Sequence, residues 1–132
     1  MQATDVFTLV QDALSRHPGL RLALLFGSAA SGQMRTDSDV DVAVLADAPL
    51  APHQHIQLIG DLAQATGRAI DLVDLSTTGE PLLGQILTHG RKLLGSTDAH
   101  AALISRHWFD TADFLPYAQR MIQERRDAWI GR

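Results

Sequence analysis

The sequence of 132 residues has no cysteine and only five prolines, and no stretch of it is apolar for long. A chain without cysteine forms no disulfides, which fits a reducing compartment, so we expect a cytoplasmic protein. A transmembrane helix needs about 18 or more consecutive apolar residues. The N-terminal residues do not resemble a signal peptide either. We therefore expect no membrane partner.

Basic residues are outnumbered by acidic ones, and the formal net charge is −4. A chain with this balance lacks the basic surface that binds nucleic acid non-specifically, so we expect no direct nucleic-acid binding. The composition, 45% hydrophobic and 20% charged, excludes a disordered protein. The length fits one compact domain, residues 1–132, with its own buried core.

The most informative stretch contains Gly27-Ser28 and, with ten residues between them, Asp39-Val40-Asp41. An apolar run precedes Gly27, so we expect a strand that ends in a turn into a short helix. The first N–H groups of a helix have no partner within it and form an anion site. Gly27 would let a phosphate approach the backbone, and Ser28 would cap the helix or donate its hydroxyl to a phosphate oxygen.

Asp39 and Asp41 lie two residues apart where the next apolar run begins. Side chains two apart in a strand point to the same face, so the two carboxylates would share one face and Val40 and Val42 the other. Like charges this close repel, and the usual compensation is a divalent cation. Mg²⁺ suits carboxylates together with substrate phosphates. The stretch therefore indicates a nucleoside triphosphate held through magnesium.

Periodicity and turn residues predict alternating helices and strands. We expect a helix over 4–17, a strand over 20–26, a helical turn and loop over 28–38, a strand over 40–45, a helix over 51–66, a strand over 69–75, a helix over 80–89 and a strand over 91–94. A helical tail follows, which Thr97 or Asp98 would cap and which is interrupted at Leu115-Pro116. The expected apolar face of the 51–66 helix consists of Ile56, Ile59, Leu62 and Ala63. We interpret Arg35, Asp37, His53 and His55 as surface residues.

The Gly27-Ser28 and Asp39-x-Asp41 pair resembles the signature of the polymerase-β-like nucleotidyltransferases, and the match extends to Gly32 and Ser38. The layout of residues 5–95 is similar to that of the minimal nucleotidyltransferases, the MNT domains encoded as antitoxins beside HEPN-domain toxins. The resemblance implies an α/β (α+β) fold. Its catalytic core, about residues 5–95, would be a short mixed sheet with helices mainly on one face, followed by a helical extension over 97–132.

The family places a third carboxylate on a neighbouring strand, and the third expected strand offers Asp71 and Asp74. If Ile70 and Leu72 pack on the helices, alternation puts Asp71 on the face of Asp39 and Asp41. Asp74 then falls on the buried side at the end of the strand, where it would serve as a turn or capping residue. We therefore favour Asp71.

The resemblance also implies a reaction, the transfer of AMP from ATP to a hydroxyl group with release of pyrophosphate. Asp39, Asp41 and Asp71 would hold two Mg²⁺ ions, while Gly27 and Ser28 would bind the β- and γ-phosphates. The acceptor implied by MNT antitoxins is a tyrosine of the cognate HEPN toxin. The alternatives are an antitoxin that acts by occlusion alone and a nucleotidyltransferase for a small-molecule acceptor.

The tail after Gly95 has two interpretations. In the first, its apolar residues cap the protein's own sheet. In the second, they form a surface that binds a partner or a second copy, because aromatic residues gather in this segment outside the catalytic core. The first apolar face would comprise Ala101, Leu103, Ile104, Trp108, Phe109, Ala112 and Leu115, and the second Ala118, Met121, Ile122 and Trp129.

Overall fold

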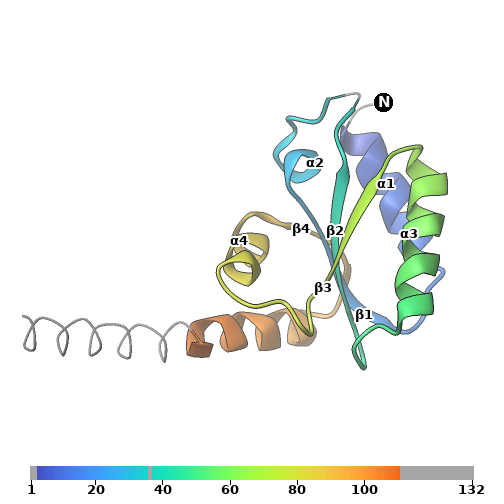
Figure 1. Ribbon diagram of the computed structural model, residues 1–132. Helices are drawn as coiled ribbons and strands as arrows, with labels where there is room; N and C mark the ends of the chain where they lie inside the picture. Colours follow the sequence, from blue (N-terminus) through green and yellow to red (C-terminus); the bar gives the residue numbers. More distant parts are fainter. Residues whose placement is uncertain (1–2, 36, 111–132) are drawn as a thin grey trace, which may run out of the picture.

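The computed structural model describes residues 3–35 and 37–110, and it confirms the predicted order of elements (Figure 1). These are α1 (Ala3–Leu14), β1 (Leu20–Phe26), α2 (Ser28–Ser31), β2 (Val40–Ala46), α3 (Pro52–Thr66), β3 (Ile70–Asp74), α4 (Leu82–His89) and β4 (Arg91–Gly95), followed by a helix over 97–110. None of the described helices is long and apolar enough to cross a membrane.

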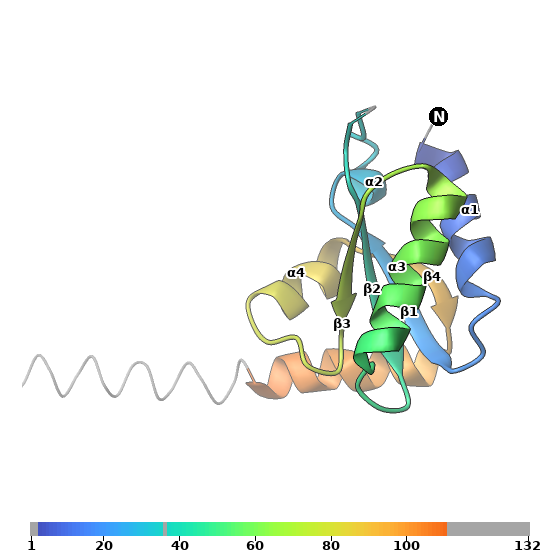
Figure 2. The ribbon, with the colours of Figure 1, turned by 45° about the vertical axis from the view of Figure 1, so that its right-hand side comes forward.

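The four strands form one mixed sheet in the order β3-β2-β1-β4 (Figure 2). β1 runs antiparallel to both β2 and β4, whereas β2 and β3 are parallel. The central strand β1 is buried on both faces, which explains its unbroken apolar run from Leu22 to Leu25. The predicted fold class and its short mixed sheet are confirmed, but the helices lie on both faces of the sheet rather than mainly on one.

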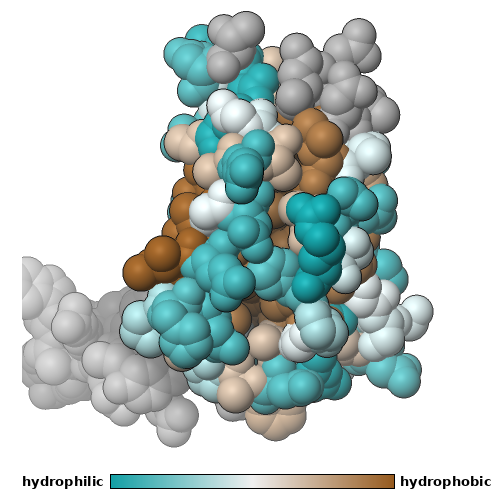
Figure 3. All heavy atoms as spheres, turned by 90° about the vertical axis from the view of Figure 1, so that its right-hand side faces the viewer, coloured by the Kyte–Doolittle hydropathy of each residue, from teal (hydrophilic) through white to brown (hydrophobic). Residues whose placement is uncertain are grey.

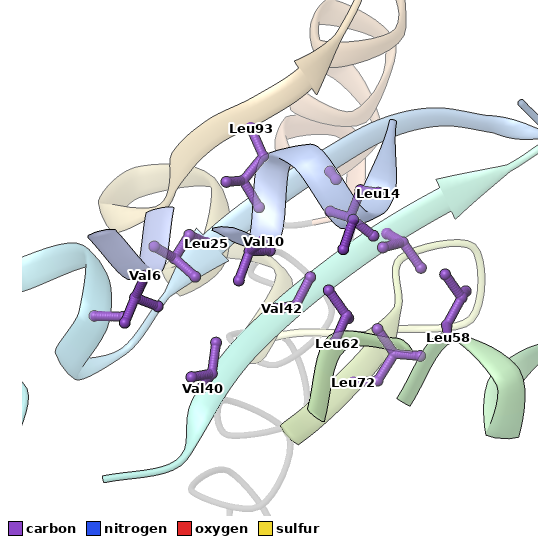
Figure 4. Packing of buried hydrophobic residues seen from close by; sticks show 14 residues of the cluster. Val6, Val10, Leu14, Leu25, Val40, Val42, Leu58, Leu62, Leu72 and Leu93 are labelled. Carbon is purple, nitrogen blue, oxygen red and sulfur yellow. The ribbon is translucent and has the colours of Figure 1, made fainter. Parts of the chain in front are cut away.

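α1 and α3 cover the first face of the sheet, and the larger core lies beneath them (Figure 4). The buried residues of this cluster include Val6, Val10, Leu14, Leu25, Val40, Val42, Leu58, Leu62, Leu72 and Leu93. The outer side of the same two helices carries hydrophilic residues across the middle of the surface (Figure 3). Burial on one side only is what fixes the amphipathic pattern of these helices.

The predicted apolar face of α3 is wrong in part. Leu62 is buried and Ile59 packs against the core, but Ile56 is 70% exposed. The buried positions are Leu58, Leu62 and Thr66, one helical turn apart, and the hydroxyl of Thr66 donates to the carbonyl of Leu62 at 2.8 Å. A polar residue satisfied by its own helix can therefore occupy a core position that a count of apolar residues does not identify.

α4 and the 97–110 helix lie on the second face, opposite α1 and α3 (Figure 1). Their core cluster comprises Leu22, Leu24, Ala43, Leu75, Leu83, Ile86, Ala99 and Leu103. This second core is smaller than the first, and the side chains of Asp39 and Asp71 are exposed. An open area at the start of β2 and β3 is therefore left on the second face.

The capping residue of the 97–110 helix lies one position earlier in the sequence than predicted. The hydroxyl of Ser96, not that of Thr97 or the carboxylate of Asp98, accepts the N–H of Ala99 at 3.1 Å, and the carbonyl of Ser96 accepts the N–H of His100 at 3.2 Å. This is the hydrogen-bond pattern of an N-cap.

Two polar side chains tie this helix to the connection between β3 and α4. Arg106 donates from Nη2 to the carbonyls of Leu75 and Thr78, both at 2.9 Å. His107 Nδ1 forms a hydrogen bond of 2.7 Å with Oε2 of Glu80. The described part of the tail thus caps the protein's own fold, as the first interpretation predicts.

The prediction that Trp108 and Phe109 belong to the buried face of the tail is wrong. Trp108 is 68% exposed and Phe109 is 70% exposed, whereas Leu103 is buried. The inward positions that follow Leu103 are taken by Arg106 and His107, which turns the aromatic pair away from the sheet. The predicted interruption at 115–116, and the predicted second apolar face with Trp129, lie outside the described residues.

We expect Trp108→Ala to change the free energy of unfolding by no more than about 0.5 kcal/mol, because a surface substitution removes little buried area. The matched control, Leu103→Ala on the inner side of the same helix, should cost about 2–5 kcal/mol. Urea unfolding of both variants measures the difference. Equal losses would mean that Trp108 is packed in the folded protein.

Candidate functional site

Gly27 makes the turn between β1 and α2. Its backbone has φ 69° and ψ −148°, a conformation that residues with a side chain rarely adopt. Its carbonyl accepts the N–H groups of Ala30 and Ser31, each at 3.2 Å, so α2 starts immediately after it. The N–H groups of Ser28 and Ala29 are the first of this helix and have no earlier helical carbonyl to bond. The predicted turn of strand into helix is confirmed.

Gly27 also lies directly against Asp41. The last residue of β1, Phe26, pairs with Asp41 in β2, which brings the next residue beside the carboxylate. A Cβ added to Gly27 would overlap Oδ2 of Asp41 and would lie 3.0 Å from its Cγ. Only glycine fits here without displacing the carboxylate, so the two halves of the sequence motif meet in space.

Asp71 lies beside Asp41 on the second face of the sheet. The parallel pairing of β2 with β3 sets the two residues directly opposite each other, at the strand spacing of about 4.8 Å. The pKa of Asp41 is raised by burial first, then by the charge of Asp71 and a hydrogen bond between the two side chains, and then by the charge of Asp39. A group of carboxylates that repel one another and raise a pKa is typical of a functional site.

Asp39 is exposed and stands immediately before β2. The loop that carries it is held by Arg68, which follows α3: its Nη1 donates to the carbonyls of Arg35 at 2.6 Å and Ser38 at 3.1 Å. The N–H of Arg35 donates to Oγ of Ser38 at 2.8 Å within the same loop. The sequence did not single out Arg68, since its partners are backbone carbonyls that no motif records.

Asp74 lies on the other face of β3, as alternation predicts. It accepts the N–H of Leu50 at 2.8 Å, the N–H of Ser76 at 2.9 Å and the hydroxyl of Ser76 at 2.7 Å. Burial alone would raise the pKa of Asp74, but these hydrogen bonds and nearby His55 outweigh it and lower the pKa. Asp74 therefore organises two loops, and the structure does not bring it to the carboxylates of β2.

We expect Asp74→Asn to destabilise the protein by about 1 kcal/mol at pH 7, after allowance for solvent screening of a partly exposed group. Because the folded pKa is lowered, the stabilisation is complete above the unfolded pKa of about 3.9 and is lost as the pH falls through the folded pKa. Urea unfolding at pH 7 and below pH 4 should therefore show the two proteins converging in acid. A constant difference would contradict the ionic role of Asp74.

The donor chemistry of the carboxylates fits a hard divalent cation. Asp41 and Asp71 offer oxygen ligands in contact with each other, and their mutual repulsion is the condition that bound Mg²⁺ relieves. Within residues 3–35 and 37–110, however, no three acidic, histidine or cysteine side chains already surround one point. The structure thus brings Asp41 and Asp71 together and leaves Asp39 beside them without closing a three-ligand site.

The site combines a Gly-Ser turn with a pair of carboxylates at the open end of a mixed sheet. This combination defines a class of nucleotide-transferring domains. The family model described as "Polymerase beta, Nucleotidyltransferase" matches residues 9–99, more than half of the chain. The chain belongs to this family. The match includes every candidate site residue: Gly27, Ser28, Asp39, Asp41 and Asp71.

Among characterised proteins, the chain is similar to the protein adenylyltransferase MntA of Shewanella oneidensis. The two sequences are 39% identical over 96 residues, which cover 73% of this chain and 67% of that protein. This relationship, together with the family model, makes the chain a nucleotidyltransferase by descent.

Two solved structures extend the similarity to most of the chain. A crystal structure of a toxin–antitoxin with AMP-PNP superposes with a TM-score of 0.77 at 28% identity, and covers 89% of this chain and 96% of that one. The MNT antitoxin in complex with the tri-AMPylated Shewanella oneidensis HEPN toxin superposes with a TM-score of 0.69 at 26% identity, and covers 89% and 97%. The predicted polymerase-β-like fold is confirmed.

Proposed function

We propose that this protein is an antitoxin that transfers AMP from ATP to a hydroxyl group of a HEPN-type toxin. The observation that carries the proposal is the contact of Gly27 with Asp41, and of Asp41 with Asp71, in a member of the nucleotidyltransferase family. The names of its relatives support the donor and the acceptor: one is a protein adenylyltransferase, one binds AMP-PNP, and one is in complex with an AMPylated HEPN toxin.

Each site residue has a task in this reaction. Gly27 leaves room for the triphosphate beside Asp41, and Ser28 donates to its β- and γ-phosphates with its hydroxyl and N–H. Asp41, Asp71 and Asp39 would hold two Mg²⁺ ions, which when bound would neutralise the charge that develops on the phosphates. We assign these roles on the donor chemistry of the carboxylates, which is that of magnesium sites.

The transfer step forms one bond and breaks one. The acceptor oxygen, a tyrosine hydroxyl of the toxin, attacks the α-phosphorus of ATP, and the bond from this phosphorus to the bridging oxygen of pyrophosphate breaks. Pyrophosphate leaves with the electron pair of that bond. Asp71 is more exposed than Asp41, and in this proposal it would orient the incoming hydroxyl and accept its proton. Most of the rate enhancement would come from positioning and electrostatics, as is general for phosphoryl transfer.

We also propose that residues 1–132 form one domain, with a catalytic core of about residues 5–95 and an extension over 97–132. The packing of Ala99 and Leu103 against the second face supports a single domain, because the described part of the extension, residues 97–110, contributes to a core that it shares with α4 and the sheet. We place the protein in the cytoplasm, where its ATP would be available.

Intact-mass spectrometry of the toxin tests the proposal. The cognate HEPN-type toxin is incubated with the full chain, ATP and Mg²⁺, and we expect its mass to rise by whole adenylyl groups. Neutralisation of the toxin without a mass change would mean that the protein acts by occlusion alone. Release of pyrophosphate from ATP with an unmodified toxin would point instead to a small-molecule acceptor.

A further inference from the structure

Lys92 is the one lysine in the sequence and stands next to Arg91 at the start of β4. The two side chains reach opposite faces of the sheet. Arg91 pairs with Leu25, and its guanidinium carbon lies 4.5 Å from the centre of the Phe7 ring on the face covered by α1. Lys92 therefore points to the second face, and it is exposed.

An extra residue in β4 decides this orientation. Ala23 pairs with Leu94 but Leu24 pairs with Lys92, so Leu93 interrupts the regular register. Leu93 and Leu94 both pack into the core of the first face. In a regular strand Leu94 and Lys92, two residues apart, would share that face. The bulge turns Lys92 to the second face, which is how such irregularities re-aim a side chain.

The second face is the one that carries the carboxylates. Phe26 is two residues beyond Leu24 along β1 and pairs with Asp41 of β2. Lys92 thus lies two strands across and two residues along from Asp41, a Cα separation of about 12 Å at standard strand spacings. The four-carbon stem of lysine covers part of this distance. The triphosphate of a nucleotide bound beside Asp41 would cover the rest.

Most other cations of the described chain are already engaged. Arg68 and Arg106 donate to backbone carbonyls, and Arg21 lies 3.6 Å from a carboxylate oxygen of Asp47. In the part of the chain that the structure describes, no carboxylate lies within ion-pair distance of Lys92. Its ammonium group is therefore available to a ligand.

We propose that Lys92 binds the terminal phosphates of the nucleotide substrate from the β4 side of the open area. This rests on the proposed function, because that function puts a triphosphate beside Asp41. The protein has a net charge of −4 and several carboxylates at this end of the sheet, so a negatively charged substrate needs positive charge opposite them. A lysine ammonium acts as a compact charge of this kind and is a common phosphate ligand.

The test is calorimetric titration of the full chain with ATP and, separately, with AMP, both with Mg²⁺. We expect Lys92→Met to weaken ATP binding by roughly tenfold or more, the value of one charge-assisted contact. AMP lacks the terminal phosphates, so its affinity should change less than about twofold. Lys92→Arg should retain most of the ATP affinity because it keeps the charge. The matched control is Arg16→Met, which removes an exposed cation paired with Asp12.

Unchanged ATP binding by Lys92→Met would overturn the assignment. Equal losses for ATP and AMP would overturn it too, because they would show an effect on the whole site rather than on the terminal phosphates. If the unmodified protein transfers AMP but Lys92→Met binds ATP normally, only this inference fails. If the unmodified protein binds no ATP at all, both the proposed function and the inference about Lys92 fail.

Discussion

Asp41→Asn should abolish AMP transfer and leave the protein at least as stable as before. The carboxylate of Asp41 has a raised pKa because burial and the neighbouring Asp71 and Asp39 disfavour its charge. A raised folded pKa means that the charged group costs stability at neutral pH, so a neutral asparagine relieves that cost. The same substitution removes a ligand charge worth several kcal/mol in the transition state, a loss of at least about a hundredfold in rate.

Toxin-modification rates and thermal melts of the same variants measure this pair of effects. Asp71→Asn should also abolish AMP transfer. The matched control is Asp47→Asn, since Asp47 is an exposed carboxylate just past the other end of β2. We expect it to leave the rate unchanged. If Asp41→Asn kept near-normal activity at saturating Mg²⁺, the assignment of the metal site would be wrong.

Gly27→Ala should lose nucleotide binding and stability together. The added methyl group would overlap Oδ2 of Asp41, and the backbone at φ 69° is unfavourable for alanine. The conformational term alone costs about 1–3 kcal/mol. Displacement of Asp41 or of the turn would in addition close the space that the triphosphate needs, so we expect ATP affinity to fall below detection in calorimetry.

A second glycine separates these two contributions. Gly67, at the end of α3, has φ 68°, and a Cβ there would meet nothing within 4 Å. Gly67 has ψ 21° and lies in the left-handed helical region, which costs alanine less than the conformation of Gly27. Gly67→Ala therefore carries a conformational cost without any overlap, and it should lower the melting temperature while ATP binding is retained. Equal ATP affinities for Gly27→Ala and Gly67→Ala would contradict a direct role of Gly27 in the site.

Much of the fold could be predicted because it follows from local patterns. The strand bounds of β1 follow from an unbroken apolar run, and the placement of Asp71 on the face of Asp41, with Asp74 on the opposite face, follows from the two-residue period of strands. The sequence motif contains both Gly27 and Asp41 but does not predict that the two residues touch. Their direct contact depends on the antiparallel register of β1 and β2, which the sequence does not state.

The features that escaped prediction depend on contacts between distant residues. Trp108 and Phe109 are exposed because Arg106 finds carbonyl partners in the β3–α4 connection and takes an inward position. The loop before Asp39 is held by Arg68 through backbone carbonyls. The direction of Lys92 depends on one extra residue in β4. None of these effects changes the periodicity of the sequence, so periodicity alone cannot reveal them.

The central claim, that the Asp41–Asp71 site transfers a nucleotidyl group to the toxin, is tested most directly with ATP labelled at either the α- or the γ-phosphate. The full chain, the HEPN-type toxin and Mg²⁺ are incubated with each, beside Asp41→Asn as control. We predict that the α-label becomes attached to the toxin, that the γ-label is released as pyrophosphate, and that the variant transfers neither. Attachment of the γ-label, or a neutralised toxin that carries no label, would contradict the account.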